Sequence, residues 1–399
     1  MNVNALIGRD HRLFDADILR HARELADAIG GSRVLVFGGA GSIGREVVRQ
    51  IFARNPAALH VIDISENNLV ELVRDLRSSA GYSAGETRFV PIDFGGVEAA
   101  AFLADQKPYD YVLNIAAMKH VRSEKDAYSL MRMIKVNVLD TLSTLRHAKN
   151  AKARKYFAVS TDKAKNPANL MGATKRIMED VLFSAANDGV TAVSTARFAN
   201  VAFSDGSLLH GFRQRLQLRQ PLSAPSDVRR YFVTGAESGL LCLASVVLGR
   251  HRDIFFPKLD AGLELLTFSE IAIRFLEANG YSPAEVASEE EARGRVDELI
   301  GQRKWPCYFF KSDTPGEKPF EEFYSETDAV DFNRFADIGV IAAPPPSPSA
   351  QASCDAFLET MNRLRAEGHW TKDELVFAIK SACPDLSHAA GERSLDDKM

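Results

Sequence analysis

The sequence predicts an α/β fold with a doubly wound, mostly parallel sheet, followed by a smaller C-terminal lobe. From about residue 33 to residue 200, short apolar runs rich in β-branched residues alternate with helical patterns. Such alternation is typical of βαβ units whose sheet is covered on both faces. The expected strands are 33–38, 58–63, 87–92, 110–115, 154–160 and 191–197, and the expected helices are 43–54, 66–79, 127–150 and 172–187.

The chain ends differ from this alternating region. Residues 11–30 carry an amphipathic helical pattern that Gly30 and Gly31 end, and we expect this arm to pack on the body or on a neighbouring subunit. After residue 200 we expect a lobe over the carboxyl ends of the strands, where open α/β sheets bind ligands. The expected divisions are an N-terminal helical arm at 1–31, the sheet domain at 32–200, a substrate-binding lobe at 201–341 and a C-terminal segment at 342–399. The last segment should contain a proline-rich connection, helices near 353–366 and 371–381, and a frayed end.

Composition excludes several classes of protein. The chain has 399 residues, of which 46% are hydrophobic and 26% charged, so it can bury a sizeable core. Its formal net charge of −4 gives no general attraction to nucleic acid or to anionic membranes. The four cysteines lack metal-ligand spacing, and neither a secretion signal nor about 18 consecutive apolar residues occur, so we expect a cytoplasmic protein with no metal site and no membrane contact.

The first expected strand runs into a glycine-rich turn, Gly38-Gly39-Ala40-Gly41-Ser42-Ile43-Gly44, and a helical pattern follows it. This context predicts a dinucleotide-binding (Rossmann) turn. Gly38 would permit the tight turn, Gly41 would let the backbone approach a pyrophosphate, and Gly44 would let the helix pack closely. Asp63 ends the next strand and would accept hydrogen bonds from an adenosine ribose, which favours NAD over NADP. The alternative role for Asp63 is a strand-end cap.

A second informative passage follows the expected strand 154–160. Thr161, Asp162 and Lys163 bring an acid and a base together at the end of that strand. Met171 and Lys175 are four residues apart on an expected helix, so they lie on one face. Methionine has no proton to transfer.

Together, the Gly-x-x-Gly-x-x-Gly spacing and this passage resemble the extended short-chain dehydrogenase/reductase superfamily. Within it they resemble the nucleotide-sugar 4,6-dehydratases of bacterial polysaccharide biosynthesis, the CapD-like branch, over about residues 5 to 340. In the superfamily a tyrosine base stands where this chain has Met171, although methionine at this position is itself a pattern within the dehydratases. The resemblance implies NAD as the cofactor, with binding residues Gly38, Gly41, Ser42, Ile43, Gly44, Asp63, Asp93, Ala116, Ala117, Lys119, Asn137 and Lys175.

The resemblance also implies catalytic roles. Hydride leaves C4 of the sugar, water is lost across C5 and C6, and hydride returns to C6. Our hypothesis makes Asp162 the general acid at O6 and Lys163 the base at C5, while Thr161, helped by Lys175, handles the C4 hydroxyl. These roles need Asp162 protonated and Lys163 neutral, hence opposed pKa shifts. The alternatives are a surface Asp-Lys pair at a turn, or a relative that has lost activity.

Three further segments resemble regions of the family that face the sugar nucleotide: 114–121, 197–207 and 316–318. The substrate-binding residues that they and the Arg230 region imply are Lys119, His120, Asn200, Ser207, Arg230 and Glu317. For Lys119 and His120 the alternative is a pair of solvated charges, for Asp93 a turn-starting aspartate, and for Glu317 a solvated acidic turn.

The sequence therefore predicts a UDP-N-acetylglucosamine 4,6-dehydratase (a lyase) that yields a 4-keto-6-deoxy sugar for a legionaminic- or bacillosamine-type surface glycan. Because Met171 cannot deliver a proton from the opposite side, we expect retention at C5. The alternatives are a C5-inverting or GDP-sugar-specific dehydratase, a nucleotide-sugar 4-epimerase, and a silent NAD-binding scaffold. The N-terminal arm and the helix pairing common in the superfamily indicate a homo-oligomer.

Overall fold

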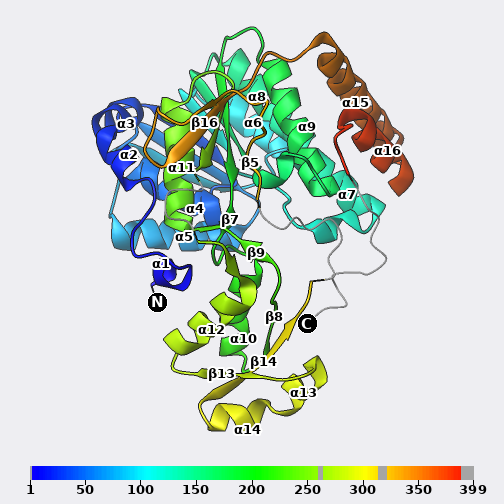
Figure 1. Ribbon diagram of the computed structural model, residues 1–399. Helices are drawn as coiled ribbons and strands as arrows, with labels where there is room; N and C mark the ends of the chain where they lie inside the picture. The colour runs from blue at the N-terminus through cyan, green and yellow to red at the C-terminus, as the bar shows by residue number, and fades with distance from the viewer. Residues whose placement is uncertain (1, 259–263, 313–320, 388–399) are drawn as a thin grey trace.

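The computed structural model describes residues 2–258, 264–312 and 321–387, and its centre is a nine-stranded sheet (Figure 1). The strand order is β15-β16-β11-β6-β5-β4-β1-β2-β3. All pairings from β11 to β3 are parallel, whereas β16 runs antiparallel to β11 and β15 antiparallel to β16. The strands are β1 Arg33–Phe37, β2 Ala58–Asp63, β3 Glu86–Pro91, β4 Tyr111–Asn114, β5 Lys155–Thr161, β6 Ala192–Phe198, β11 Asp253–Pro257, β15 Val330–Asp331 and β16 Ile338–Ala342.

Helices cover both faces of this sheet, which confirms the doubly wound α/β fold (Figure 1). One group pairs α4 with α11 and the other pairs α8 with α9, and both groups contact β5. The centre is consistently apolar, since every residue of β4 and β11 is buried, as are Val47, Val48 and Ile51 of α4. The helices of this part are α4 Ser42–Phe52, α5 Glu66–Ser79, α6 Val97–Ala104, α7 Ala127–Ile134, α8 Asp140–Asn150, α9 Leu170–Ala185 and α11 Gly235–Leu248.

Two expected helices are divided in the structure. The helix expected over 127–150 contains a π-helical turn at Lys135–Leu139 between α7 and α8. Single π turns inside α-helices are frequent at functional sites, and this one holds Asn137. The helix expected over 11–30 is two helices, α2 Asp15–Arg20 and α3 Ala22–Ile29, which follow a four-residue helix α1 at Val3–Leu6.

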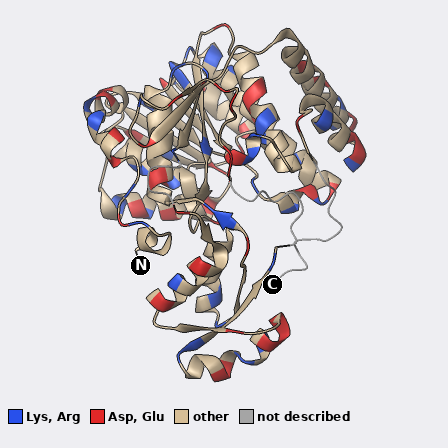
Figure 2. Cartoon of the chain, in the orientation of Figure 1, with Lys and Arg blue, Asp and Glu red and all other residues tan. Residues whose placement is uncertain are grey.

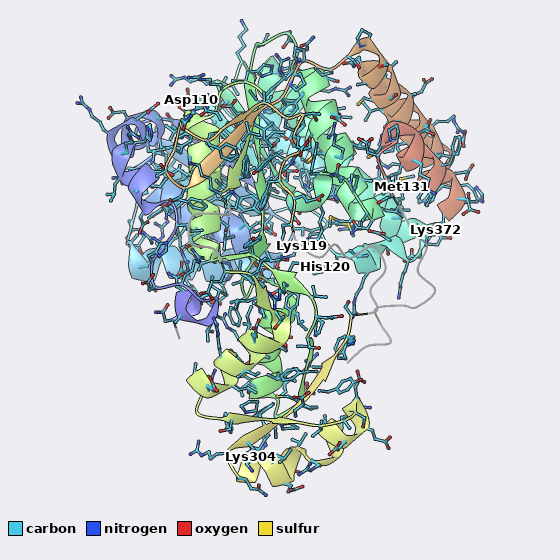
Figure 3. All side chains as sticks on the ribbon, viewed as in Figure 1. Asp110, Lys119, His120, Met131, Lys304 and Lys372 are labelled. Atoms are coloured by element: carbon cyan, nitrogen blue, oxygen red, sulfur yellow. The ribbon has the colours of Figure 1, made fainter. Side chains whose placement is uncertain are left out.

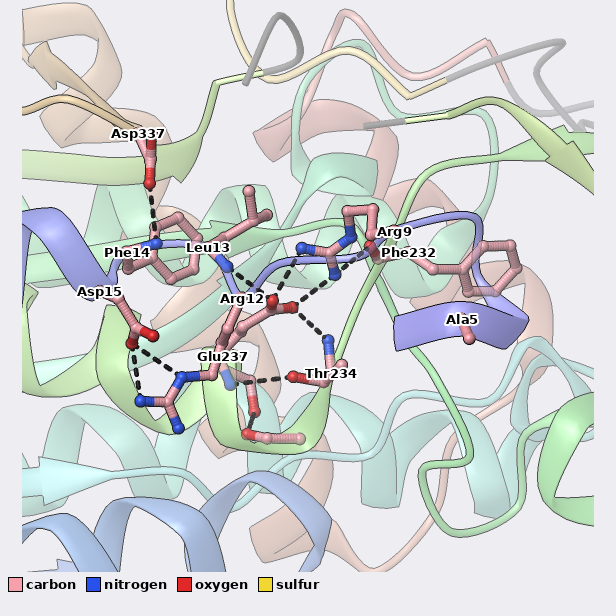
Figure 4. Close-up of polar contacts among 12 residues, drawn as sticks. Ala5, Arg9, Arg12, Leu13, Phe14, Asp15, Phe232, Thr234, Glu237 and Asp337 are labelled. Carbon is pink, nitrogen blue, oxygen red and sulfur yellow. Dashed lines mark hydrogen bonds and ion pairs between the residues drawn. The ribbon is translucent and has the colours of Figure 1, made fainter. Parts of the chain in front are cut away.

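The N-terminal arm is fastened to the sheet domain by a buried ion pair (Figure 4). Both terminal nitrogens of Arg9 donate to the carboxylate of Glu237 at 2.7 Å, and the backbone N–H groups of Leu13 and Thr234 donate to the same carboxylate. Further along, Asp17 accepts the backbone N–H groups of residues 336 and 337. Of the two placements expected for the arm, the structure therefore has it on the body of its own chain.

The smaller lobe has its own three-stranded parallel sheet, ordered β13-β14-β8, and its own apolar core (Figure 1). Trp305, Phe275 and Phe212 are buried in that core, which Leu6 and Ile7 of the N-terminal arm also join. Two short two-stranded sheets, β7 with β10 and β9 with β12, connect the lobe to the main domain. The elements are β7 Asn200–Val201, α10 Leu208–Gln217, β8 Leu222–Pro225, β9 Arg229–Arg230, β10 Phe232–Val233, β12 Leu266–Thr267, α12 Phe268–Ala278, β13 Ser282–Glu285, α13 Glu289–Gly294, α14 Val296–Gly301 and β14 Lys304–Phe310.

The expected division at residue 200 does not separate the two cores. The range 201–341 holds the lobe, but it also holds α11, β11 and β15 and most of β16, which belong to the nine-stranded sheet domain. The chain thus leaves the sheet after β6, returns for α11 and β11, leaves again for the lobe, and returns to add β15 and β16. A short strand pairing with a distant one leaves little trace in local sequence periodicity, which is why the return was not predicted.

The C-terminal helices α15 Pro348–Glu367 and α16 Lys372–Ala382 confirm the two helical patterns expected after the proline-rich connection. Ser347 caps α15 through its side chain, and Pro348 occupies the first turn, where its missing N–H costs nothing. Both helices pack on α9, and Trp370 donates its indole N–H to the carbonyl of Ala127 (Figure 1). The frayed end expected beyond Ser387 lies outside the described residues.

Acidic and basic side chains are interspersed over both parts of the molecule (Figure 2). Within the described ranges, no helix has both the length and the apolar character that crossing a lipid bilayer requires. In the same residues, no three His, Cys, Asp or Glu side chains are grouped closely enough to hold a metal ion.

Candidate functional site

The glycine turn at the end of β1 has three positions that the protein's own packing reserves for glycine. A side-chain carbon at Gly38 would lie 2.5 Å from the backbone nitrogen of Ala116, and Gly38 has a φ of +71°. At Gly39 it would lie 2.4 Å from Val61, and at Gly44 it would lie 2.1 Å from the carbonyl oxygen of Gly38. These contacts explain a tight turn and a close helix without any ligand.

Gly41 differs, because a side-chain carbon there would meet only the carbonyl oxygen of Gly38, at 3.7 Å. Gly41 is the N-cap of α4, and no side chain caps this helix. The Nε atom of Arg45, one turn into α4, is buried without a hydrogen-bond partner. An open cradle, an uncapped helix N-terminus and an orphaned guanidinium nitrogen fit an anionic group such as a pyrophosphate.

Asp63 and Asp93 lie at the carboxyl ends of neighbouring strands. Asp63 accepts the backbone N–H of Ala40 in the glycine turn and that of Ser65, both at 2.9 Å. Its carboxylate therefore both holds the turn and acts as a strand-end cap, and each oxygen keeps a lone pair for a ribose hydroxyl. Asp93 accepts the N–H of Gly95 and so begins a turn two residues after β3.

The segment after β4 lies against the glycine turn; we call these two segments the rims, and the open space beside Gly41 the groove. Ala116 touches Gly38, and Ala117 follows it half-buried. Lys119 and His120 lie between the sheet domain and the smaller lobe (Figure 3). The Lys119 amine donates to the hydroxyl of Ser204 at 3.3 Å, so it is not simply a solvated charge.

Asn137, in the π-helical turn, ties this rim to α9. Its carbonyl oxygen accepts the N–H of Met118 at 2.9 Å, while its amide nitrogen donates to the Met118 carbonyl and to the hydroxyl of Thr174. Asn137 is fully buried. Asn137 thereby fixes Thr174, the residue before Lys175, and so helps to position Lys175 by direct hydrogen bonds within the protein.

The acid and the base expected at the end of β5 are adjacent and partly shielded from solvent. The Asp162 carboxylate lies 3.5 Å from the Lys163 amine and accepts the Thr161 hydroxyl at 2.8 Å. The Asp162 side chain is 10% exposed and that of Lys163 35%. The pair is therefore half-desolvated rather than freely solvated.

Lys175 lies on α9, and Met171 lies one turn earlier on the same helix. Burial lowers the pKa of Lys175 to about 7, and its amine donates to the Val159 carbonyl at 2.8 Å and contacts the sulfur of Met178. The Thr161 hydroxyl donates its hydrogen bond to Asp162, and the Lys175 amine donates to the Val159 carbonyl. The structure therefore shows no direct contact by which Lys175 would give Thr161 the expected assistance. Met171 is buried, and its N–H donates to Glu124.

Asn200 and Arg230 converge on the buried carboxylate of Glu321, which follows the Gly-Glu-Lys run but was not among the predicted substrate-binding residues. The side-chain amide of Asn200 donates to Glu321, the backbone N–H of Tyr231 donates to its other oxygen at 3.2 Å, and the Arg230 guanidinium lies 3.8 Å away. Glu321 is 3% exposed. No spacing rule links residue 321 to residues 200 and 230, so only the folded chain reveals this group.

The remaining substrate-binding expectations have different outcomes. Ser207 caps α10, where its hydroxyl accepts the N–H of His210 at 3.2 Å. Glu317, with the Gly-Glu-Lys run around it, lies outside the described residues. Glu124 is a second buried carboxylate that the sequence did not identify, and burial raises its pKa.

Replacing Glu321 with Gln is expected to remove a pH dependence of folding stability. Burial, with repulsion from Asp162, raises the pKa of Glu321 from 4.5 to about 7. The native state therefore keeps a proton that the unfolded chain has lost, so the wild-type protein loses stability as the pH rises from about 5 through 7. We expect its free energy of unfolding, relative to that of Glu321→Gln, to fall by about 2 kcal/mol between pH 5 and pH 8 in urea titrations.

Glu71→Gln, at an exposed surface ion pair, is the control for this comparison. The expectation would be contradicted if the free energies of unfolding of wild type and Glu321→Gln differed by the same amount at pH 5 and at pH 8.

The parallel sheet with its glycine turn, and the lysine on the helix after β5, give this protein the fold of an extended short-chain dehydrogenase/reductase. The chain belongs to the family of polysaccharide biosynthesis proteins, which it matches over residues 34–343.

The sequence is also similar to several individual proteins. The chain is 30% identical over 314 residues to a Methanocaldococcus jannaschii protein called uncharacterized membrane protein MJ1061, covering 77% of this chain and 85% of that one. Capsular polysaccharide biosynthesis protein CapD of Staphylococcus aureus is 29% identical over 333 residues, 82% of this chain but only 50% of CapD. A UDP-N-acetylglucosamine 4,6-dehydratase (inverting) of Campylobacter jejuni is 28% identical over 237 residues, 58% of this chain and 68% of the dehydratase. UDP-glucose 4-epimerases of Rickettsia species are also among the relatives.

Solved structures confirm the fold. Pen from Bacillus thuringiensis superposes with a TM-score of 0.65 at 22% identity, covering 79% of this chain and 89% of Pen. A DesIV double mutant, a dTDP-glucose 4,6-dehydratase of Streptomyces venezuelae with NAD bound, gives a TM-score of 0.52 at 18% identity, covering 73% and 88%. Several neighbours of this fold are NAD-bound dehydratases and epimerases.

Proposed function

We propose that this protein is an NAD-dependent nucleotide-sugar 4,6-dehydratase that converts UDP-N-acetylglucosamine to a 4-keto-6-deoxy sugar for a bacterial surface glycan. The observation that carries the proposal is the Asp162–Lys163 pair, an acid and a base 3.5 Å apart at the carboxyl end of β5. The similarity to the Campylobacter jejuni dehydratase supports it.

The groove around Gly41 suits NAD. The uncapped N-terminus of α4 would hold the pyrophosphate, and Asp63 would accept a ribose hydroxyl and disfavour a 2′-phosphate. Bound NAD would accept the hydride from C4 and return it to C6. Lys175, held by the Val159 carbonyl, would orient the nicotinamide ribose.

Asp162 and Lys163 would carry the protons of the elimination. Transfer of one proton from lysine to aspartate converts the ion pair to a neutral pair without changing its proton count. Binding of a sugar that excludes water favours that neutral pair, because separated charges are costly in a dry site. Lys163 then takes the C5 proton, while Asp162 protonates the departing C6 hydroxyl, and one water is lost.

Thr161 would complete the proton balance. The C4 hydroxyl loses its proton before Asp162 gives up its own, so that proton would leave to solvent through the Thr161 hydroxyl, and Asp162 would regain a proton from solvent after the water has departed. Lys163 returns a proton to C5 when hydride reaches C6. With Met171 unable to supply a proton from the other face, delivery by Lys163 favours retention at C5.

A nucleotide-sugar 4-epimerase is the second candidate, because such enzymes are among the relatives. An epimerase exchanges hydride at C4 alone and has no use for an acid aimed at O6. The adjacent Asp162 and Lys163 therefore favour dehydration.

The deciding experiment incubates the purified protein in deuterated water with UDP-N-acetylglucosamine and, separately, with its GDP analogue, with and without added NAD. We expect mass spectrometry to find the loss of one water from the UDP sugar, and proton NMR to find deuterium at C5 with retained configuration. A product of unchanged mass with inverted C4 would establish the epimerase instead. Turnover of neither sugar, despite bound NAD, would favour a silent scaffold.

A further inference from the structure

Residues 204–206, which we call the strap, follow β7 and cross from the connection to the smaller lobe onto the glycine turn. The backbone N–H of Asp205 donates to the hydroxyl of Ser42 at 2.7 Å, in the first turn of α4. The Asp205 carboxylate lies 3.6 Å from the guanidinium of Arg45 on the same helix. The middle residue of the strap is thus fastened to the rim of the groove that begins at β1.

The strap is also fastened to the other rim, the segment after β4. Ser204 accepts a hydrogen bond from the Lys119 amine at 3.3 Å. Gly206 has a φ of +71°, and a side-chain carbon there would lie 2.7 Å from the ring of His120. The imidazole therefore packs directly on the strap backbone, leaving no room for a larger residue.

The two rims flank the groove that would hold the cofactor. β1 and β4 are neighbouring parallel strands, and their carboxyl ends lead into the glycine turn and into the Lys119–His120 segment. Within the groove, Gly41 has open space and α4 has no capping side chain. Four separate contacts therefore tie the strap to both rims beside that space.

Retention of the cofactor matters for this reaction more than for an ordinary dehydrogenase. The hydride removed from C4 has to return to C6 of the same sugar, so a reduced cofactor that escaped between the two steps would leave a dead intermediate. A closure over the groove slows escape without contacting the sugar.

We propose that the strap closes over the bound dinucleotide and retains it between the two hydride transfers, with Asp205 as the positioning residue that holds the strap shut. The proposal rests on the proposed function in one respect, which is that the groove takes a dinucleotide. It does not depend on which sugar is used.

The test measures how fast the dinucleotide leaves wild-type protein, Asp205→Ala and Gly206→Ala. Protein loaded with radiolabelled NAD is chased with unlabelled NAD, and the label that stays with the protein on desalting is counted over time. We expect Asp205→Ala to release NAD about 2- to 5-fold faster than wild type, because its ion pair with Arg45 is half-exposed. Gly206→Ala should release NAD at least about 10-fold faster, because the added methyl group would meet the His120 ring and push the strap away from it. Asp205→Asn keeps a polar side chain that can still contact Arg45 but loses the negative charge, so it should fall between Asp205→Ala and wild type.

Asp188→Ala, an exposed aspartate paired with Lys149 far from the groove, is the matched control and should release NAD at the wild-type rate. Wild-type release rates in both Asp205→Ala and Gly206→Ala, with melting temperatures unchanged, would overturn the strap while leaving dehydration intact. Failure of the wild-type protein to bind NAD at all would overturn the strap and the cofactor assignment together, and the product assay above separates these two cases.

Discussion

Asp162→Asn is expected to lower kcat for dehydration by about 100- to 10,000-fold, the usual contribution of a positioned general acid. Asparagine has nearly the same shape and can still accept the Thr161 hydroxyl, but it cannot protonate the departing C6 hydroxyl. Substrate binding should change little, because the substitution removes a proton donor rather than a contact surface. Single-turnover loss of water, followed by mass spectrometry with NAD added, measures the effect.

The control for this variant is Asp188→Asn, which makes the same chemical change at an exposed position. We expect it to turn over at the wild-type rate. If Asp162→Asn dehydrated its substrate at a rate near wild type, the acid would have to be another group, and the buried Glu321 would be the first to test.

Glu237→Gln is expected to destabilise the fold by about 3–5 kcal/mol, because it leaves the Arg9 charge buried without its partner. The two side chains are 1% and 0% exposed, and both terminal nitrogens of Arg9 donate to Glu237. The same carboxylate also caps α11 through Thr234, so the loss includes part of a capping box. Urea denaturation followed by circular dichroism gives the free energy of unfolding.

The double variant Arg9→Met with Glu237→Gln separates pairing from simple truncation. We expect it to be less destabilised than the sum of its two single variants, since neither partner is then left charged and alone. Glu71→Gln, which breaks the exposed pair with Arg74, should change stability by under about 1 kcal/mol. Additive losses in the double variant would show that the buried pair is not coupled.

The elements of the sheet domain could be predicted because their hydrophobic periods are long and regular. The strand expected at 58–63 and the helix expected at 66–79 have the observed limits, and the other expected elements agree within a few residues, whereas α6 and α11 were not predicted. The π-helical turn at Lys135–Leu139 could not be predicted, because one inserted hydrogen-bond step barely alters a helical apolar pattern. Nor could the return of β11 and β16, which depends on partners far along the chain.

The residues of the candidate site also divide into those that local sequence predicts and those that it does not. Gly41, Asp162 and Lys163 were accessible to sequence reasoning because each belongs to a compact motif at the end of one strand. Glu321 was not, because its environment consists of residues 200, 230 and 231, brought together only by the two-stranded connection between the domains. A single glutamate in a sequence with many acidic residues cannot be recognised as a site residue until the structure shows that its carboxylate is buried.

The contact between Asp17 and the backbone of Asp337 has a consequence for how the protein is made. The two residues are 320 positions apart, so at about 5–20 residues per second a ribosome takes about 16–64 s to deliver the second after the first. During that interval the amino-terminal arm and the outer edge of the sheet lack their partners, and a nascent chain exposes both. The fold of this protein is therefore completed only after translation of β16. The first 200 residues expressed alone would leave the edge of β6 that β11 covers unpaired, and such an edge can pair with other chains.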